Sequence, residues 1–179
     1  MHATNMAMTD IKTKAGQMAE AARLLDSVCD PEIPVLTIAD LGILRDLRWD
    51  ESDPDTLEVV ITPTYSGCPA MNTIEVNIRA VLQEGGFEKV KITTILSPAW
   101  TTDWMSASGR QKLEEFGIAP PAEASLDKQA LFGERRILRC PHCGSTNTEM
   151  IAQFGSTACK ALFKCLDCLE PFDYFKCHS

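Results

Sequence analysis

The chain has 179 residues, of which 45% are hydrophobic and 23% are charged, and this composition is typical of a globular protein. It contains no run of roughly 18 to 20 apolar residues, so we expect neither a membrane span nor a membrane partner. The net charge of −8 falls entirely on residues 1–119, and neither this part nor the balanced remainder offers the basic face that binds a phosphate backbone, so we expect no nucleic-acid partner.

Residues 1–15 are polar and are predicted to form a disordered tail. They lack the apolar core of a secretory signal, and we therefore expect a cytoplasmic protein. Apolar side chains recur at helical spacing from Gln17 to Val28, which predicts a first helix. The two prolines of the segment from Asp30 to Pro34 end this helix, because each removes a backbone donor and disfavours helix just before itself.

The elements expected after this helix are two strands, a helix, a third strand and a short helix, at residues 43–49, 57–62, 69–83, 90–96 and 106–116. Turn-forming residues between the first two strands favour a hairpin, and a loop at residues 64–69 precedes the longer helix. Pro69 suits the start of that helix, where a missing N–H is tolerated. The order α-β-β-α-β-α predicts a small α+β domain at residues 16–118.

A linker is predicted at residues 119–135, where two adjacent prolines and small polar residues interrupt any periodicity. From residue 136 the sequence changes to short β-like runs, cysteine pairs and aromatic residues, which predicts a mainly β domain at residues 136–179. Six of the eight cysteines lie in this last segment. Because a reducing compartment does not maintain disulfides, this clustering favours a metal site.

Two C-x₂-C pairs in the last segment, with 21 residues between them, are expected to hold one metal ion. The expected ligands are Cys140, Cys143, Cys165 and Cys168. Zinc is the first choice, because four thiolates in a tetrahedron are its usual structural site, and a single iron or an iron–sulfur cluster can use the same ligands. A segment of roughly forty residues cannot bury a sufficient core alone, so the metal is expected to supply much of its folding energy.

Three further cysteines are candidates for a second or transient metal or thiol site. Cys159 and Cys177 remain in the ribbon segment, and inert packing is the alternative for both. Cys68 precedes the helix at Pro69, whose N-terminus favours thiolate over thiol, so we expect a lowered pKa and a partly exposed, reactive sulfur. Inert packing is the alternative for Cys68 as well. The first domain contains no histidine to act as a base, and we therefore assign no catalytic residue.

Asp30, Glu32 and Asp40 lie on the segment after the first helix. Solvated turn residues and helix caps are the default interpretation, and contacts with a metal or a partner are the alternative. Trp100 and Trp104 are four residues apart, so they can share one helical face. Core packing is the default for them, and a docking patch for a partner is the alternative.

Long segments of the chain resemble known families. The stretch from Asp30 to Gly42 and the loop Thr64-Tyr-Ser-Gly-Cys-Pro69 resemble the MIP18-like family, also called DUF59, whose members assist iron–sulfur cluster assembly. The segments at residues 97–105, 117–121, 154–162 and 170–177 resemble the D subunits of the ring 1,2-phenylacetyl-CoA epoxidase. Together the resemblances cover nearly the whole chain after residue 16, and Cys68 matches the cysteine of the MIP18-like loop.

The resemblance implies a role in aerobic phenylacetate degradation. The epoxidase of that pathway has a di-iron catalytic subunit, a structural partner and a reductase with flavin and an iron–sulfur cluster, and the resemblance implies that this chain helps to mature that assembly. The implied function is thus a non-catalytic accessory or maturation subunit that assists metal or iron–sulfur centre assembly. The alternative is a zinc-ribbon subunit that binds protein and only stabilises the oxygenase complex.

The expected partners are the oxygenase and reductase subunits, with a homodimer as a further option. The aromatic end of the ribbon, from Phe172 to Phe175, is the expected contact. The sequence contains no nucleotide-binding glycine motif, no flavin signature and no pair of Glu-x-x-His motifs for a di-iron centre. We therefore expect no enzyme activity of the chain alone.

Overall fold

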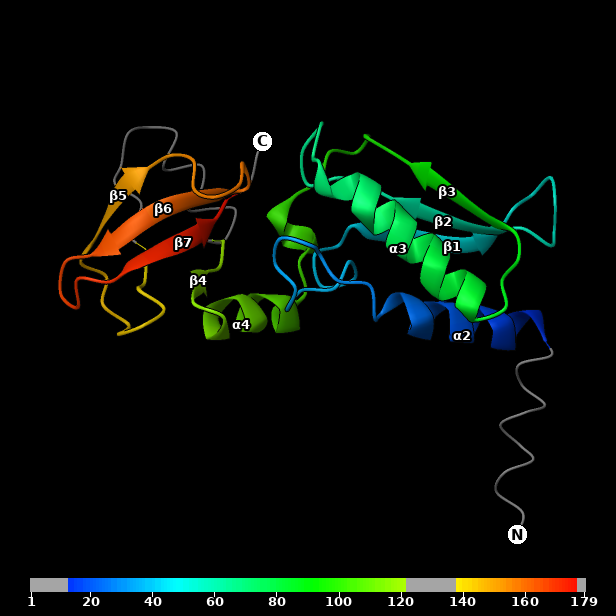
Figure 1. The fold of residues 1–179 in the computed structure, drawn as a ribbon, viewed down its shortest axis with the longest axis horizontal. Helices are drawn as coiled ribbons and strands as arrows, with labels where there is room; N and C mark the ends of the chain where they lie inside the picture. Colours follow the sequence, from blue (N-terminus) through cyan, green and yellow to red (C-terminus); the bar gives the residue numbers. More distant parts are fainter. Residues whose placement is uncertain (1–12, 122–137, 177–179) are drawn as a thin grey trace, which may run out of the picture.

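The computed structural model describes residues 13–121 and 138–176. A first domain of helices on a sheet lies beside a ribbon domain of strands (Figure 1). Residues 1–12 of the predicted tail, and most of the predicted linker, lie outside the described residues. Within the described part of the chain, no helix is long and apolar enough to cross a membrane.

The first domain has the α+β order expected from the sequence. Its elements are α2 (Lys14–Leu25), β1 (Leu44–Trp49), β2 (Leu57–Ile61), α3 (Ala70–Glu84), β3 (Val90–Thr94), the 3₁₀ helix η1 (Thr102–Trp104) and α4 (Ala107–Glu115). The sheet has the order β1-β2-β3, with β1 antiparallel to β2 and β2 parallel to β3. Helices α2 and α3 pack on each other and on the outer strands, and all five residues of the central strand β2 are buried. Side chains of β2 alternate between the two faces of the sheet, and Glu58 of β2 is bonded to Arg48, Lys91 and Thr93 of the outer strands.

Helix α3 forms the crossover between the parallel strands β2 and β3. Ile74, Ile78 and Leu82 recur every four residues and are fully buried, so one face of the helix packs on the sheet. Pro69 is the N-cap of α3 and precedes its first helical residue. The crossover places the loop after β2 beside the segment after β3, and these two segments form the walls of the cavity described below.

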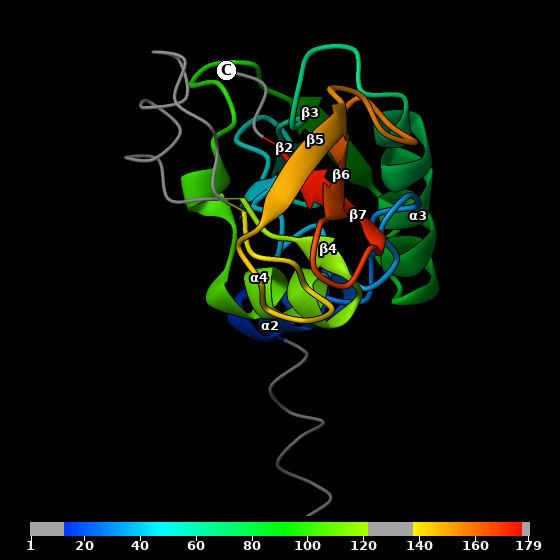
Figure 2. The same cartoon turned by 90° about the vertical axis from the view of Figure 1, so that its left-hand side faces the viewer.

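The ribbon domain is a four-stranded sheet in the order β4-β7-β6-β5 (Figure 2). Its strands are β4 (Ile118–Ala119), β5 (Thr148–Ala152), β6 (Lys160–Cys165) and β7 (Pro171–Phe175). Strands β5, β6 and β7 are antiparallel neighbours, whereas β4 is parallel to β7. Since β4 follows α4 almost directly, the residues directly after α4 supply one strand of the ribbon sheet. The sequence pattern does not predict β4, because two residues are too few to show an alternation.

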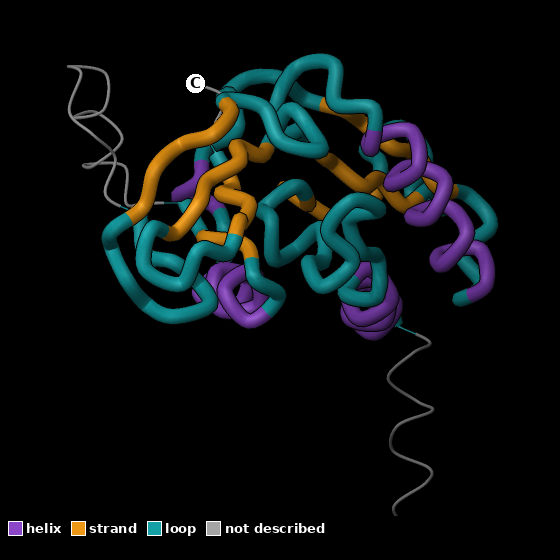
Figure 3. Tube along the Cα trace, turned by 60° about the vertical axis from the view of Figure 1, so that its left-hand side comes forward, coloured by secondary structure: helices purple, strands orange, loops and turns teal. Residues whose placement is uncertain are grey.

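The two domains lie side by side (Figure 3), and apolar side chains of both share one core at their junction. Phe175, the last residue of β7, lies edge-on to Trp100 with the ring centroids 6.2 Å apart, and both rings are buried. Trp100 Nε1–H donates to the carbonyl oxygen of Leu41 over 2.8 Å, which fixes the indole in the first domain. Phe175 and Cys159 belong to the same apolar core as the first domain's helices. The ribbon is therefore attached by side-chain packing as well as by strand β4.

Trp100 and Trp104 do not lie on a common helix. Trp100 precedes the 3₁₀ helix η1, and Trp104 is its last residue. The Arg45 guanidinium carbon lies 3.5 Å from the centroid of the Trp104 ring, a cation–π contact. Both tryptophans thus pack within the first domain and its junction.

The aromatic end of the ribbon is buried. Phe172, Tyr174 and Phe175 are each at most 3% exposed. Tyr174 and Phe172 pack on the ring of Phe163 with centroid distances of 5.8 and 6.0 Å, and they form the small core of the ribbon. The expectation that this segment contacts a partner is therefore wrong, because its rings fill the ribbon core and the junction.

We expect Phe175→Ala to weaken the junction. Truncation of a buried phenylalanine usually costs about 3 to 5 kcal/mol of unfolding free energy, and the aromatic pair with Trp100 adds to that burial. Urea unfolding followed by tryptophan fluorescence measures the loss. Phe175→Leu keeps most of the apolar volume and should lose less than half as much. An alanine variant as stable as the unaltered protein would show that the junction contributes no packing energy.

Candidate metal centre and junction thiols

The four predicted ribbon ligands come together around the turn that follows β6. The sulfurs of Cys140, Cys143, Cys165 and Cys168 all lie within 4.8 Å of one another. The sulfurs of Cys140 and Cys168 are 3.8 Å apart, and those of Cys143 and Cys165 are 3.5 Å apart. Thiolates bound at about 2.3 Å to one tetrahedral zinc ion lie about 3.8 Å from each other, so the set fits zinc. Iron takes the same four ligands, and the geometry does not separate the two metals.

The two cysteine pairs lie in turns of matching shape. Gly144, directly after the first pair, has a φ of 74°, and Leu169, directly after the second pair, has a φ of 66°. In each turn the N–H of the first cysteine donates to the backbone carbonyl five residues later. A left-handed conformation costs a residue with a side chain roughly 1 to 2 kcal/mol. The hydrogen bonds of the second turn therefore hold Leu169 in this conformation, although the first turn has a glycine at the matching position.

Backbone N–H groups favour the charged form of the Cys165 sulfur. Hydrogen bonds from the N–H groups of Cys168 and Asp167 lower the pKa of Cys165 to about 7. A thiol must lose its proton before it binds a metal, and oriented N–H groups stabilise the resulting charge. The carboxylate of Asp167 also accepts hydrogen bonds from the side chains of Ser145 and Asn147. These bonds join the second turn to the chain that follows the first.

Cys68 lies in the loop before α3 with its thiol half-buried. Burial raises the pKa of Cys68, and the negative charges of Asp30 and Glu32 raise it further. Hydrogen bonds from the Ala70 N–H and the Tyr65 hydroxyl lower the pKa by less. The lowered pKa expected from the sequence is therefore wrong. The first N–H of α3 does reach the sulfur, but the loss of solvent around the thiol outweighs it.

Cys159 lies on the ribbon side of the junction, directly before β6. It is 8% exposed, and its sulfur lies 3.0 Å from Thr157 Oγ1. Burial raises the pKa of Cys159, and the charges of Glu32, Asp30 and Cys68 raise it further. Cys177, the other candidate for a second site, lies outside the described residues.

Asp30 and Glu32 lie on the turn after α2, and both are partly exposed. Asp30 Oδ1 accepts hydrogen bonds from the N–H groups of Glu32 and Ile33, each over 2.8 Å, and these bonds close the turn. Glu32 forms no ion pair with any residue in the ranges 13–121 and 138–176.

Asp40 is buried, and its carboxylate holds α4 against the turn after α2. The hydroxyls of Ser106 and Ser108 donate to Oδ1 over 2.7 and 2.9 Å, and Lys112 Nζ lies 2.5 Å from Oδ2. Although burial acts to raise it, these hydrogen bonds hold the pKa of Asp40 well below its usual range. Asp40 therefore positions α4, and its oxygens are engaged within the fold.

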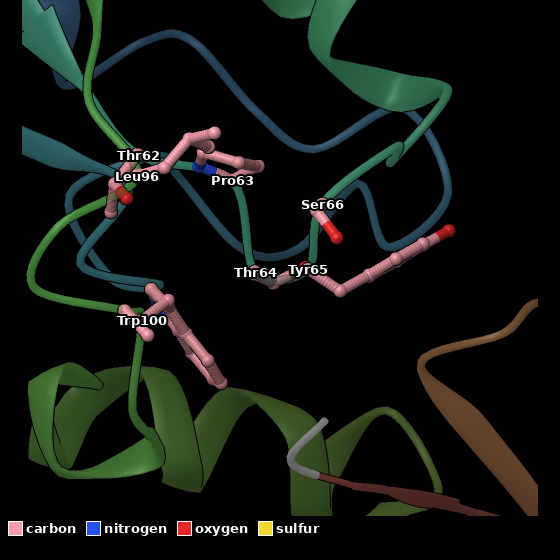
Figure 4. A pocket seen from close by; sticks show the side chains of 8 residues that line it. Thr62, Pro63, Thr64, Tyr65, Ser66, Leu96 and Trp100 are labelled. Atoms are coloured by element: carbon pink, nitrogen blue, oxygen red, sulfur yellow. The ribbon is translucent and has the colours of Figure 1, made fainter. Parts of the chain in front are cut away.

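A cavity of about 470 Å³ opens beside the Cys68 loop (Figure 4). It is lined by Thr62, Pro63, Thr64, Tyr65, Ser66, Leu96, Ala99 and Trp100. Figure 4 shows the Tyr65 side chain extending from its loop away from Trp100. Burial and the neighbouring Cys68 raise the pKa of Tyr65 to about 12. The sequence analysis does not single out Tyr65. Its position three residues before Cys68 is the only sequence feature that points to a role for it.

Two family models match separate parts of the chain. An iron–sulfur cluster assembly protein family matches residues 18–94, and the PaaD zinc beta ribbon domain matches residues 124–176. A protein of Escherichia coli (strain K12), provisionally named as the D subunit of a 1,2-phenylacetyl-CoA epoxidase, is 48% identical over 161 residues. The alignment covers 90% of this chain and 93% of that protein.

Two solved structures are also similar to the chain. The domain of unknown function DUF59 from Bacillus anthracis is 24% identical with a TM-score of 0.48, over 54% of this chain and 90% of that one. A conserved hypothetical protein from Thermotoga maritima is 25% identical with a TM-score of 0.44, over 56% of this chain and 93% of that one. The family and relative matches confirm the resemblances found in the sequence.

We expect Cys143→Ser and Cys168→Ser each to release the ribbon metal. The loss of one thiolate opens the tetrahedral set, and a ribbon with so small a core depends on the metal for its folding energy. Metal analysis should fall from about one equivalent to near zero, and limited proteolysis should cleave within residues 138–176. Cys29→Ser, which changes a thiol of the first domain, should leave both measurements unchanged. A double variant with a full equivalent of zinc and a protease-resistant ribbon contradicts the assignment.

We expect Cys68 to be alkylated slowly at neutral pH. Its pKa is raised by burial, so the reactive thiolate is scarce at pH 7 and increases about tenfold per pH unit up to that pKa. Mass spectrometry of iodoacetamide-treated protein gives the rate in the folded chain and in urea. Tyr65→Phe removes a hydrogen bond to the sulfur and should slow the reaction further. A folded-state rate at pH 7 equal to the rate in urea contradicts this account.

Proposed function

This chain belongs to the family of the 1,2-phenylacetyl-CoA epoxidase's D subunit, and we propose that it is an accessory protein that helps to assemble the metal or iron–sulfur centres of that epoxidase. The observation that carries the proposal is the pairing of two units in one chain. A segment that matches a cluster-assembly family precedes a four-cysteine ribbon, and the E. coli relative spans both. In this role the chain handles the metal of another subunit and catalyses no epoxidation itself.

The ribbon metal has a structural role in this proposal. Four sulfurs complete a tetrahedral site, so an ion held there keeps no open position for a substrate or for exchange. Zinc suits such a closed site because it has no redox chemistry that the fold must control. Iron in the same ligands is the alternative, and elemental analysis of the purified chain distinguishes them. The handling of iron is thus assigned to the first domain and the junction.

The proposed partners are the oxygenase and reductase subunits of the epoxidase. The ribbon offers them a contact surface, because Met150, Ile151, Phe154 and Leu169 are between 52% and 63% exposed. Met150 and Ile151 lie on β5, an edge strand of the ribbon sheet among residues 13–121 and 138–176, and an edge strand can pair with another chain. We also propose a cytoplasmic location, since a reducing compartment keeps cysteines as the thiols and thiolates that a metal site needs.

This exposed edge also favours a second candidate function. A ribbon that docks through β5 can stabilise the oxygenase complex without any transfer of metal. The two functions differ in what the oxygenase lacks when this chain is missing. In the first it lacks iron, and in the second it lacks only a binding partner.

The test is to express the oxygenase subunits with and without this chain and to measure epoxidase activity and iron content. We expect under-metallated, weakly active oxygenase in its absence, and recovery when the purified chain and ferrous iron are added together. Cys68→Ser should fail to restore activity, whereas Cys29→Ser should restore it fully. A fully metallated, active oxygenase made without this chain contradicts the maturation role and favours the stabilising one.

A further inference from the structure

The cavity beside the Cys68 loop lies at the carboxyl ends of two parallel strands. One wall is the loop after β2, and the other is the segment after β3 that contains Trp100 (Figure 4). The hydroxyl of Thr62 donates to the carbonyl oxygen of Ile95 over 2.7 Å, and this bond joins the two walls. The space beyond the carboxyl ends of parallel strands is where open α/β sheets commonly bind ligands.

Thr64 places a buried polar group in this cavity. Its exposed fraction is 9%, and its hydroxyl has no hydrogen-bond partner among residues 13–121 and 138–176. Buried hydroxyls are nearly always paired, because an unpaired one has given up its hydrogen bond to water for nothing. The hydroxyl of Thr62 is paired in this way, and Ser66 is exposed. The Thr64 hydroxyl therefore requires a partner from a molecule inside the cavity.

The rest of the lining is mainly apolar and uncharged. Pro63, Leu96, Ala99 and Trp100 form the apolar part, and none of the eight lining residues is acidic or basic. Leu96 is 63% exposed, so a ligand packed against it removes apolar surface from water. Sites for small molecules are typically concave spaces of roughly 300 to 1,000 Å³ with apolar walls and a few fixed polar groups. The volume of about 470 Å³ lies in that range.

Charge selects among the ligands that offer an oxygen to this hydroxyl. A carboxylate or phosphate in the cavity would have no Lys, Arg or His side chain among the lining residues. It would also meet the part of the chain that carries the whole net charge of −8. Burial of an anion without a paired cation costs far more than burial of a neutral carbonyl group. A neutral carbonyl therefore suits the Thr64 hydroxyl better than an anion does.

We propose that this cavity binds an uncharged small molecule of the amide or ester class with a compact apolar body. The carbonyl oxygen of the ligand accepts a hydrogen bond from the Thr64 hydroxyl, and the apolar body packs against Leu96 and Trp100. The same loop continues to Cys68, whose N–H donates to the carbonyl oxygen of Tyr65 over 3.2 Å. The ligand thus contacts the loop of the thiol that the maturation test changes, but the existence of the site does not rest on that role.

The test is a titration of the full-length chain, with zinc in the ribbon, with benzamide, benzoate and toluene. The three probes share one ring, and only benzamide adds a neutral carbonyl. We expect benzamide to bind with a dissociation constant on the order of 1 mM, because so small a ligand makes few contacts. Toluene and benzoate should each bind about 3- to 10-fold more weakly. Protein-observed NMR gives these constants, and benzamide should shift the amide signals of residues 62–66 and 96–100.

Thr64→Val keeps the branched shape of the side chain and removes its hydroxyl. The loss of one neutral hydrogen bond should weaken benzamide binding about 3- to 10-fold and leave toluene binding unchanged. Without a ligand, this variant should be at least as stable in urea as the unaltered chain, because the hydroxyl has no partner in the fold to lose. A purely structural hydroxyl would give the opposite result, a loss of stability with benzamide binding unchanged.

Ala99→Leu fills part of the cavity from an exposed position. The added side chain should weaken the binding of benzamide and toluene about tenfold or more, because it occupies the space of the ring. Ala80→Leu makes the same change at an exposed position of α3 outside this cavity, and it should alter neither constant. The pair separates loss of the cavity from a general effect of added apolar surface.

The proposal is overturned if benzamide at ten times the expected dissociation constant shifts no signal of residues 62–66 and 96–100. That result would leave water as the partner of the Thr64 hydroxyl. The proposal also fails if benzoate binds more tightly than benzamide, or if Thr64→Val or Ala99→Leu keeps the full affinity for benzamide. The titration contains no oxygenase and changes no cysteine, so its failure is distinct from a failure of the maturation role.

Discussion

The ribbon segment is too short to fold by burying its own apolar surface, and most features of the molecule follow from this constraint. The hydrophobic core formed by the ribbon alone consists of a few aromatic and aliphatic side chains around Phe163. Two further sources of free energy complete it. Four converging sulfurs offer a metal-dependent cross-link, and Phe175 packs against Trp100 of the first domain. A ribbon stabilised in this way is part of the first domain's surface rather than an appendage to it.

The environment of Cys68 depends on more than the helix that follows it. The N-terminus of α3 by itself favours the thiolate. In the folded chain the sulfur is half-buried, and the nearby carboxylates of Asp30 and Glu32 add to the cost of its ionisation. Packing at the junction also places Cys159 in the apolar core that contains the first domain's helices.

Elements governed by local periodicity could be predicted from the sequence. The apolar spacing of α3 and the turn between β1 and β2 are visible in the sequence, and so are the converging C-x₂-C pairs. Features set by long-range contacts could not be predicted. Strand β4 is too short to show a period, and the pKa direction at Cys68 depends on what covers it. The burial of Phe175 depends on Trp100, which lies in the other domain.

Because β4 pairs in parallel with β7, the ribbon sheet begins earlier in the chain than the segment that matches the ribbon family. The ribbon family matches from residue 124, but Ile118 and Ala119 already form one strand of the ribbon sheet, opposite Asp173 and Tyr174. A ribbon expressed from residue 124 would lack that strand, and β7 would become an exposed sheet edge with unpaired N–H and C=O groups. Such an edge is a template for intermolecular strand addition. Aggregation of an isolated ribbon would then arise from a missing strand, even with its metal in place.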